Sequence, residues 1–145
     1  MATFNKLNGY VEHLAEGVHD HGSDQHVIAL TNTAPGSEST PPTGATGTNI
    51  LANLTEVSYT NLSSRNITTS SSAQSAGTYT LSLTDLVLTA SGGSVGPFRY
   101  VYLYNDTPTS PADPLIGYWD YGSALTLLDG ETLTIDFATG TMTLT

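Results

Sequence analysis

The stretch that decides the fold is Phe98–Tyr104, which reads FRYVYLY. Its aromatic residues fall at every second position from Phe98 to Tyr104, so in a strand they would share one face. Val101 and Leu103 would then occupy the opposite face. Because both faces carry apolar side chains, we expect a strand that is covered on both sides.

Shorter strand signals flank this stretch along the chain. Asp129-Gly130 lies between two apolar runs and is a strong hairpin signal. At Thr84-Asp85 the alternation changes phase, which predicts a bulge or a change of strand. The expected strands cover residues 25–30, 65–69, 77–90, 115–121, 124–128, 131–137 and 142–144. Short strands separated by turns predict a mainly β fold, an antiparallel β-sandwich with a jelly-roll-like core.

The N-terminal segment carries a helical pattern instead. Its apolar residues are spaced by three and four positions, which predicts an amphipathic helix over residues 4–18 with Thr3 as its N-cap. About four turns containing two glycines are marginally stable alone, so the apolar stripe must dock on the β core or on another subunit. The stripe consists of Phe4, Leu7, Val11, Leu14 and Val18.

A stretch without core-forming residues follows at 31–48. It combines three prolines and three glycines with serines and threonines, which is typical of an extended surface arm. We therefore divide the chain into an N-terminal helix, strand and Thr/Ser/Pro-rich arm (1–48) and a β-sandwich core (49–145). The length fits one compact domain overall.

The charge of the chain excludes several classes of partner. Its 145 residues include 3 Lys+Arg against 13 Asp+Glu, for a formal net charge of −10. Nucleic acids and anionic membranes both require a basic surface, so we expect neither as a partner. No apolar run reaches the ~18 residues of a membrane span, and the first residues lack the pattern of a secretory signal. The absence of cysteine excludes disulfides and thiolate metal sites.

The histidines are the first candidates for chemistry. All of them lie within residues 13–26, next to Asp20 and Asp24, and imidazoles with carboxylates are good ligands for zinc. Their spacing matches no closed zinc pattern, so we interpret the segment as a flexible polar linker and expect no metal site. The four positions are His13, His19, His21 and His26.

No catalytic group is predicted from the remaining motifs. Asp106, Asp113 and Asp120 surround a proline-rich loop, where aspartates usually bond nearby backbone N–H groups. Facing carboxylates could cleave glycosides and loop carboxylates could bind calcium, but no ligand series or suitable environment is visible. Ser91–Gly96 lacks the nucleophile elbow and the phosphate-loop lysine. We therefore expect a protein that is not an enzyme and needs no cofactor.

Tyrosine and tryptophan residues gather in the strand region. Such side chains are favoured where one end packs and the other reaches water. Core packing, a protein interface and a carbohydrate-binding face are all compatible with them, and we favour the interface over the carbohydrate face. The positions are Tyr100, Tyr102, Tyr104, Tyr118, Trp119 and Tyr121.

Several segments resemble a group of small virion structural proteins of tailed bacteriophages. These segments are Ala29–Pro35, Leu54–Tyr59, Ser91–Thr107, Asp113–Ser123 and Leu128–Phe137. The resemblance implies a virion part, most directly a capsid decoration (cement) protein that binds the outer surface of the head and stabilises the shell. A tail component is the main alternative. The group supplies no catalytic residues.

The resemblance also implies partners and a location. The partners would be the major capsid protein and further copies of this chain, with a trimer favoured. We expect assembly in the host bacterial cytoplasm and a place on the capsid surface, because packed DNA would repel an anionic protein inside. The predicted contact residues are Phe4, Leu7, Val11, Leu14, Val18, Tyr102, Tyr104 and Trp119. An adhesin that binds host glycans through Tyr102, Tyr104, Trp119 and Tyr121 is a second alternative.

Overall fold

The chain consists of β-strands with short helices at its N-terminal end and in one connection. The computed structural model describes residues 2–37, 40–42, 49–137 and 141–145. The strands are β1 (Phe4–Lys6), β2 (His26–Thr31), β3 (Asn66–Ile67), β4 (Thr69–Ser75), β5 (Thr78–Leu83), β6 (Leu86–Thr89), β7 (Val95–Asn105), β8 (Leu115–Leu127), β9 (Thr132–Ile135) and β10 (Met142–Leu144). The helices are α1 (Asn8–Ala15) and the 3-10 turn η1 (Leu51–Asn53).

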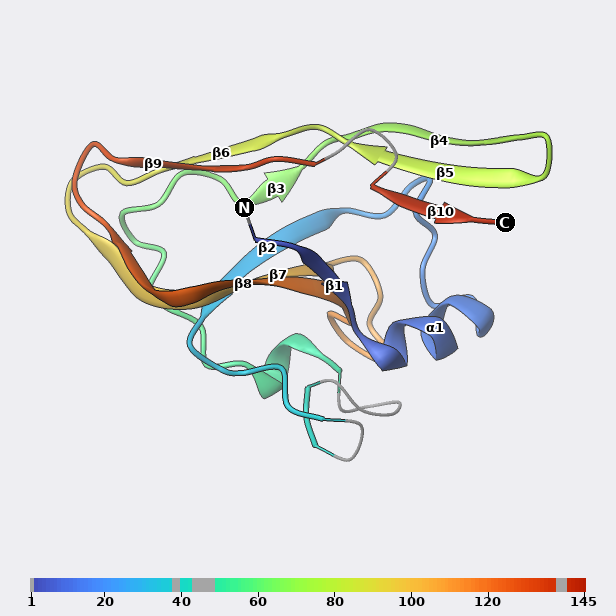
Figure 1. Cartoon of the computed structure of the whole chain (residues 1–145), viewed down its shortest axis with the longest axis horizontal. Helices are drawn as coiled ribbons and strands as arrows, with labels where there is room; N and C mark the ends of the chain where they lie inside the picture. The colour runs from blue at the N-terminus through green and yellow to red at the C-terminus, as the bar shows by residue number, and fades with distance from the viewer. Residues whose placement is uncertain (1, 38–39, 43–48, 138–140) are drawn as a thin grey trace.

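The strands form two stacked layers (Figure 1). Within the described residues, one layer is a five-stranded sheet in the order β1-β8-β7-β2-β3. Within the same described residues, the other layer combines a three-stranded sheet, β10-β5-β4, with the two-stranded pair β6-β9. The strand pairs in these sheets are antiparallel, so the predicted mainly β, antiparallel fold is confirmed.

The central strand β7 is covered on both faces, as predicted. Val101 and Leu103 face the core between the layers, whereas Tyr100 and Tyr102 face a second apolar cluster on the outer side of the sheet. Phe98 does not share the tyrosine face. The register against β8 shifts on both sides of Phe98, and its fully buried side chain lies in the core between the layers. The irregularity turns this side chain over, so the prediction of a single aromatic face is wrong at Phe98.

The main core lies between the two layers. It includes Ile28 and Leu30 of β2, Leu81 and Leu83 of β5, and Ile135 of β9. A smaller cluster covers the outer face of the five-stranded sheet, beneath η1. Its buried members are Leu7, Val27, Ala29, Leu54, Tyr100, Tyr102, Tyr104 and Leu115.

The chain changes sheet where its alternation changes phase. β5 and β6 belong to different sheets, and Thr84-Asp85 lies between them. The carboxylate of Asp85 accepts a hydrogen bond from the backbone N–H of Phe137 at 2.8 Å. The predicted change of strand is therefore confirmed.

The turn at Asp129-Gly130 joins the two layers and does not form a hairpin. β8 pairs with β7, whereas β9 pairs with β6. The runs predicted as separate strands at 115–121 and 124–128 are one long strand, β8. β8 stays paired with β7 up to its last residue, Leu127, and the turn then leads into β9 of the other layer, so the predicted hairpin is wrong.

The N-terminal segment begins as a strand. Phe4 lies in β1, which pairs with β8, and the backbone N–H of Leu7 donates to the carbonyl of Ile116 at 3.0 Å. α1 starts after Leu7, which is its N-cap in an extended conformation. The predicted extent of the helix, 4–18 with Thr3 as its cap, is wrong because sheet pairing replaces the first turn of a marginal helix.

The predicted arm packs on the body where the structure describes it. The hydroxyl of Tyr102 donates to the carbonyl of Thr33 at 3.1 Å, which holds the chain after β2 against the outer cluster. Residues 38–39 and 43–48 of the predicted arm lie outside the described residues. β2, from the N-terminal part of the chain, pairs with β7 along its whole length.

Candidate functional site

An apolar groove opens between the two layers next to α1. Within the described residues, β1 is an edge of the five-stranded sheet and β10 is an edge of the opposite layer, and both lie near α1 (Figure 1). The cavity between them has a volume of about 240 Å³. We call it the N-terminal groove, and it is lined by Phe4, Lys6, Tyr10, Val11, Leu14, Met142, Thr143 and Leu144.

The rim of the N-terminal groove exposes large apolar side chains. Val11 is 52% exposed and Leu144 is 45% exposed. A single exposed apolar residue is ordinary, but apolar side chains around one apolar hollow are typical of a contact surface. Lys6 places an ammonium group beside them.

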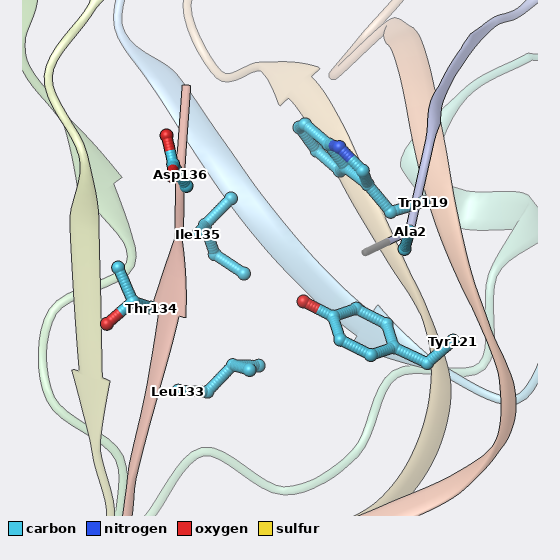
Figure 2. Close-up of a pocket in the computed structure, with 7 residues that line it drawn as sticks. All are labelled: Ala2, Trp119, Tyr121, Leu133, Thr134, Ile135 and Asp136. Atoms are coloured by element: carbon cyan, nitrogen blue, oxygen red, sulfur yellow. The ribbon is translucent and has the colours of Figure 1, made fainter. Parts of the chain in front are cut away.

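A second cavity lies between β8 and β9, with a volume of about 360 Å³. Figure 2 shows Trp119 and Tyr121 on one wall, with Leu133 and Ile135 across from them. The ring of Phe4 packs against Trp119 with the ring centroids 4.8 Å apart. Phe4 of β1 thus lines the groove and packs on Trp119, which lines the second cavity.

The predicted contact residues divide between surface and core. Phe4, Val11 and Leu14 line the N-terminal groove. Val18 is half-buried beyond the end of α1. The remaining residues are at most 8% exposed, so in the isolated chain they are core side chains and offer little contact surface. These residues are Leu7, Tyr102, Tyr104 and Trp119.

The buried face of α1 differs from the predicted stripe. The helix buries Gly9, Tyr10 and His13, and it turns Val11 to the solvent. The reason is that Tyr10 and His13, three residues apart, lie on the same helical face and meet a polar cluster at the end of the sandwich. The predicted stripe of five apolar residues on one helical face is therefore wrong.

That polar cluster contains the four histidines, which we call the histidine cluster. His13 lies on α1, His19 and His21 lie in the following connection, and His26 is the first residue of β2. All four side chains are buried. The ring centroids are 5.9 Å apart between His13 and His19, 5.2 Å between His19 and His21, and 5.2 Å between His21 and His26. The interpretation of this segment as a flexible polar linker is therefore wrong.

Two hydrogen bonds run through the middle of the cluster. The hydroxyl of Tyr10 lies 2.8 Å from Nε2 of His21. Nδ1 of His21 lies 2.9 Å from Nε2 of His26. Since two imidazole nitrogens share the second bond, one of them must carry the proton and the other must accept it.

Asparagine side chains fix the two outer histidines. The amide of Asn105 donates to Nδ1 of His19 at 3.1 Å and to the carboxylate of Asp24 at 2.6 Å. The amide of Asn49 donates to Nδ1 of His13 at 3.4 Å. Nδ1 therefore accepts in both rings, and neutral His13 and His19 carry their proton on Nε2. In the described part of the chain, both Nε2 atoms are buried without a hydrogen-bond partner.

Burial lowers the pKa of all four histidines. The pKa of His19 falls to about 3, first through burial and then through the neighbouring imidazoles. The pKa of His26 falls to about 4 for the same reasons, although Asp24 opposes the shift. The pKa values of His13 and His21 are also lowered, mainly by burial. The cluster is thus neutral at pH 7.

The histidine cluster is not arranged as a metal site. Among residues 2–37, 40–42, 49–137 and 141–145, no three histidine, aspartate or glutamate side chains are placed to hold a metal ion. The cluster was not predicted, because the spacing of the histidines along the sequence matches no zinc pattern. The one available signal was the pairing of Tyr10 with His13 at helical spacing.

The aspartates flagged from the sequence separate into different environments. Asp120 accepts two hydrogen bonds from Arg99, at 2.7 and 2.8 Å, and this pairing lowers the pKa of its carboxyl to about 2. Asp113 lies next to Asp106, and burial followed by the charge of Asp106 raises the pKa of the Asp113 carboxyl. Asp120 is thus held as a fixed anion, whereas Asp106 and Asp113 form a separate pair.

Comparison with protein-family models, with curated proteins and with solved structures gave no match to this chain. A search of the described helices for a membrane span found none that combines sufficient length with sufficient apolar character.

Proposed function

We propose that this chain is a non-enzymatic structural protein of a tailed-phage virion, a decoration protein that binds the outer surface of the capsid head. The sequence resemblance supports this role, and so does the antiparallel β-sandwich. The observation that carries the proposal furthest is the N-terminal groove. Three of the predicted contact residues, Phe4, Val11 and Leu14, line this one apolar surface.

The groove offers free energy of binding that the folded chain does not use. Covering apolar surface is worth about 25 cal/mol per Å², so half-exposed side chains such as Val11 and Leu144 contribute about 1 kcal/mol each. That is weak for one copy. Copies repeated by symmetry on a shell bind with avidity, and a homotrimer would present three such surfaces at once. A protein that binds the assembled lattice in preference to its parts stabilises the shell by mass action.

The charges suit an outer surface. Two of the 3 Lys+Arg side chains are occupied by carboxylates, since Arg65 lies 3.6 Å from Glu56 and Arg99 is bonded to Asp120. Little positive charge is left for contact with DNA or for ionic anchoring. We therefore expect attachment through apolar contacts, with the major capsid protein as partner and weak dependence on salt.

Fractionation of virions tests the location. We expect the protein to remain with purified tail-less heads and to be missing from isolated tails, as measured by quantitative mass spectrometry. Removing it by heat should lower the temperature at which the heads break. Copurification with tails and absence from heads would instead assign the chain to the tail.

A matched pair of variants tests the groove. Val11→Ser removes apolar surface at the rim of the groove, whereas Val87→Ser makes the same change on β6; both valines are 52% exposed. We expect Val11→Ser to weaken the affinity of the protein for heads by about fivefold or more, because about 1 kcal/mol is lost at each copy. Val87→Ser should bind like the unmodified chain. Equal binding by both variants would exclude the groove as the contact.

The second cavity keeps a glycan-binding adhesin as a second candidate. Tyr121 is 36% exposed and shares one wall of this cavity with the largely buried Trp119, and Asp136 adds a carboxylate (Figure 2). Tyr102 and Tyr104 are buried, so they are no longer part of the proposed glycan-binding surface. A glycan array would show binding by the unmodified chain that Tyr121→Ala abolishes. An array without signal above background would remove the candidate.

A further inference from the structure

The histidine cluster joins the N-terminal elements to the end of the sandwich. The sequence has 4 His, and all of them lie in this cluster. Asn105, the last residue of β7, bonds His19 from the sandwich side. His26 opens β2, so the cluster reaches from α1 across the connection at 16–25 to two strands of the five-stranded sheet.

The docking of α1 depends on this cluster. The helix has eight residues, and its buried residues are Gly9, Tyr10 and His13. Two of these three contact the cluster from the helix: His13 is a member and adjoins His19, and Tyr10 bonds His21. A helix of this length is not stable in water without tertiary contacts. If the cluster opens, α1 therefore loses the hydrogen bond of Tyr10 and the ring contact of His13, which are made by two of its three buried residues.

We propose that the histidine cluster is an acid-operated latch, which holds α1 and the connection at 16–25 against the sandwich when neutral and releases them when protonated. The hydrogen bonds supply the mechanism. Nδ1 of His19 accepts from the Asn105 amide, and Asp24 fixes the orientation of that amide. A proton on Nδ1 would place two N–H groups face to face. The bond between His21 and His26 also fails once both rings are cations.

The surrounding carboxylates do not compensate for this charge. Asp24 already accepts hydrogen bonds from the backbone N–H of Asp20 and from Asn105, so it can balance one imidazolium at most. Neighbouring imidazolium ions about 5 Å apart would repel one another strongly in a buried site. The titratable groups that face the histidines are Tyr10, Glu12, Glu16, Asp20, Asp24 and Tyr79.

The direction of the response follows from the lowered pKa values. A released histidine has a pKa of about 6.5, whereas burial holds the pKa of His26 at about 4 and that of His19 at about 3. At pH values between the lowered pKa values of the latched form and the ordinary value of about 6.5, the released form therefore binds more protons than the latched form. The latch is stable above about pH 6.5 and weakens as the pH falls toward 4.

Release changes the N-terminal groove. Tyr10, Val11 and Leu14 of α1 form one side of it, so acid would dismantle that side and leave the strands in place. The latch does not depend on the capsid role, because every group in it belongs to this chain. If the capsid role also holds, acid would loosen the attachment to the head.

Hydrogen exchange on the full chain tests the latch. Protection factors, corrected for intrinsic rates, are measured by mass spectrometry between about pH 7.5 and pH 4. We expect protection of α1 and 16–25 to fall by about tenfold or more below pH 6, while β7 and β8 remain protected. Simultaneous loss of protection in α1, β7 and β8 would overturn the proposal.

Two variants sharpen the test. His19→Phe keeps a ring beside His21 but cannot take a proton, so the midpoint of opening should move lower by about half a pH unit or more. Glu131→Gln removes an exposed carboxylate in the turn that precedes β9, where a glutamine can still accept from the backbone N–H of Leu128, and it should leave the midpoint unchanged. Equal midpoints for His19→Phe and the unmodified chain would refute the latch.

A titration of the unmodified chain covers the case in which His19→Phe does not fold. The imidazole NMR signals of the four histidines should titrate below about pH 6 and together with the loss of protection in α1. Independent titration near pH 6.5 with α1 still protected would refute the proposal as well.

Discussion

At the scale of single residues, Asn49 and Gly9 fix where α1 can sit. Asn49 is fully buried and its amide reaches His13 on the helix. A Cβ atom at Gly9 would lie 2.5 Å from Cγ of Asn49, so the helix approaches this closely because residue 9 has no side chain. The buried amide and the missing side chain therefore form a fitted pair.

This pair predicts that Gly9→Ala destabilises the chain. Alanine normally favours a helix by about 1 kcal/mol over glycine. Here we expect the free energy of unfolding to fall by about 1–3 kcal/mol, because the new methyl group overlaps the Asn49 side chain. Urea unfolding at pH 7.5 measures the change. In an Asn49→Ala background the same substitution should cost less, as a double-mutant cycle would show. A stabilising Gly9→Ala in the unmodified chain would contradict the fit.

At the scale of elements, β1 depends on Gly117 in β8. A Cβ atom there would overlap the ring of Phe4 and lie 2.7 Å from the carbonyl oxygen of Asn5. Gly117→Ala should therefore push β1 away from β8 and cost about 1–3 kcal/mol. Trp119 is the single tryptophan of the chain and packs on Phe4, so its fluorescence should shift to the red.

The control for this prediction is Ser123→Ala, an exposed change on the same strand. It should leave the fluorescence and the midpoint of unfolding unchanged. An unshifted Trp119 spectrum in Gly117→Ala would show that β1 does not depend on this close approach.

Alternation along the chain was sufficient to predict strands such as β2, β7 and β8, but it missed β1 and most of β4, and it did not give the strand partners. The phase change at Thr84-Asp85 correctly marked a change of strand, because it records which face is buried. The turn at Asp129-Gly130 has the local chemistry of a hairpin, but the pairing of β8 with β7 and of β9 with β6 is a long-range property. Phe98 departs from its pattern because the register against β8 shifts on both sides of it, which places its side chain on the opposite face from the tyrosines.

The candidate site was predicted in part for the same reason. Helical spacing predicted Phe4, Val11 and Leu14 as contact residues, and these three residues do line one groove. They meet through a strand and a helix, since Phe4 belongs to β1. The histidine cluster could not be predicted, because its partners Asn49 and Asn105 come from distant parts of the chain.

At the scale of the whole molecule, two electrostatic effects act in opposite directions as the pH falls. The formal net charge of −10 at pH 7 repels itself in the compact state, and this repulsion fades toward the pI of about 4.3. The buried histidines become less favourable over the same range, because burial lowers their pKa values. Acid therefore reduces the repulsion among the carboxylates while it favours protonation of the buried histidines, which destabilises the folded chain. Salt screens the repulsion but has little effect on the buried histidines, so it can separate the two effects.

Salt should stabilise the protein at neutral pH. Raising NaCl from about 20 to 300 mM shortens the range of repulsion among the surface carboxylates, while the histidine cluster is neutral and buried. We expect Tm at pH 7.5 to rise by a few degrees, roughly 2–5 °C for a chain of this size. The same salt step near pH 4.3 should change Tm much less, since little net charge remains to be screened. Differential scanning calorimetry measures both steps. A fall in Tm with salt at pH 7.5 would mean that ion pairs such as Arg99 with Asp120 outweigh the repulsion, and that the net charge does not control the stability of the sandwich.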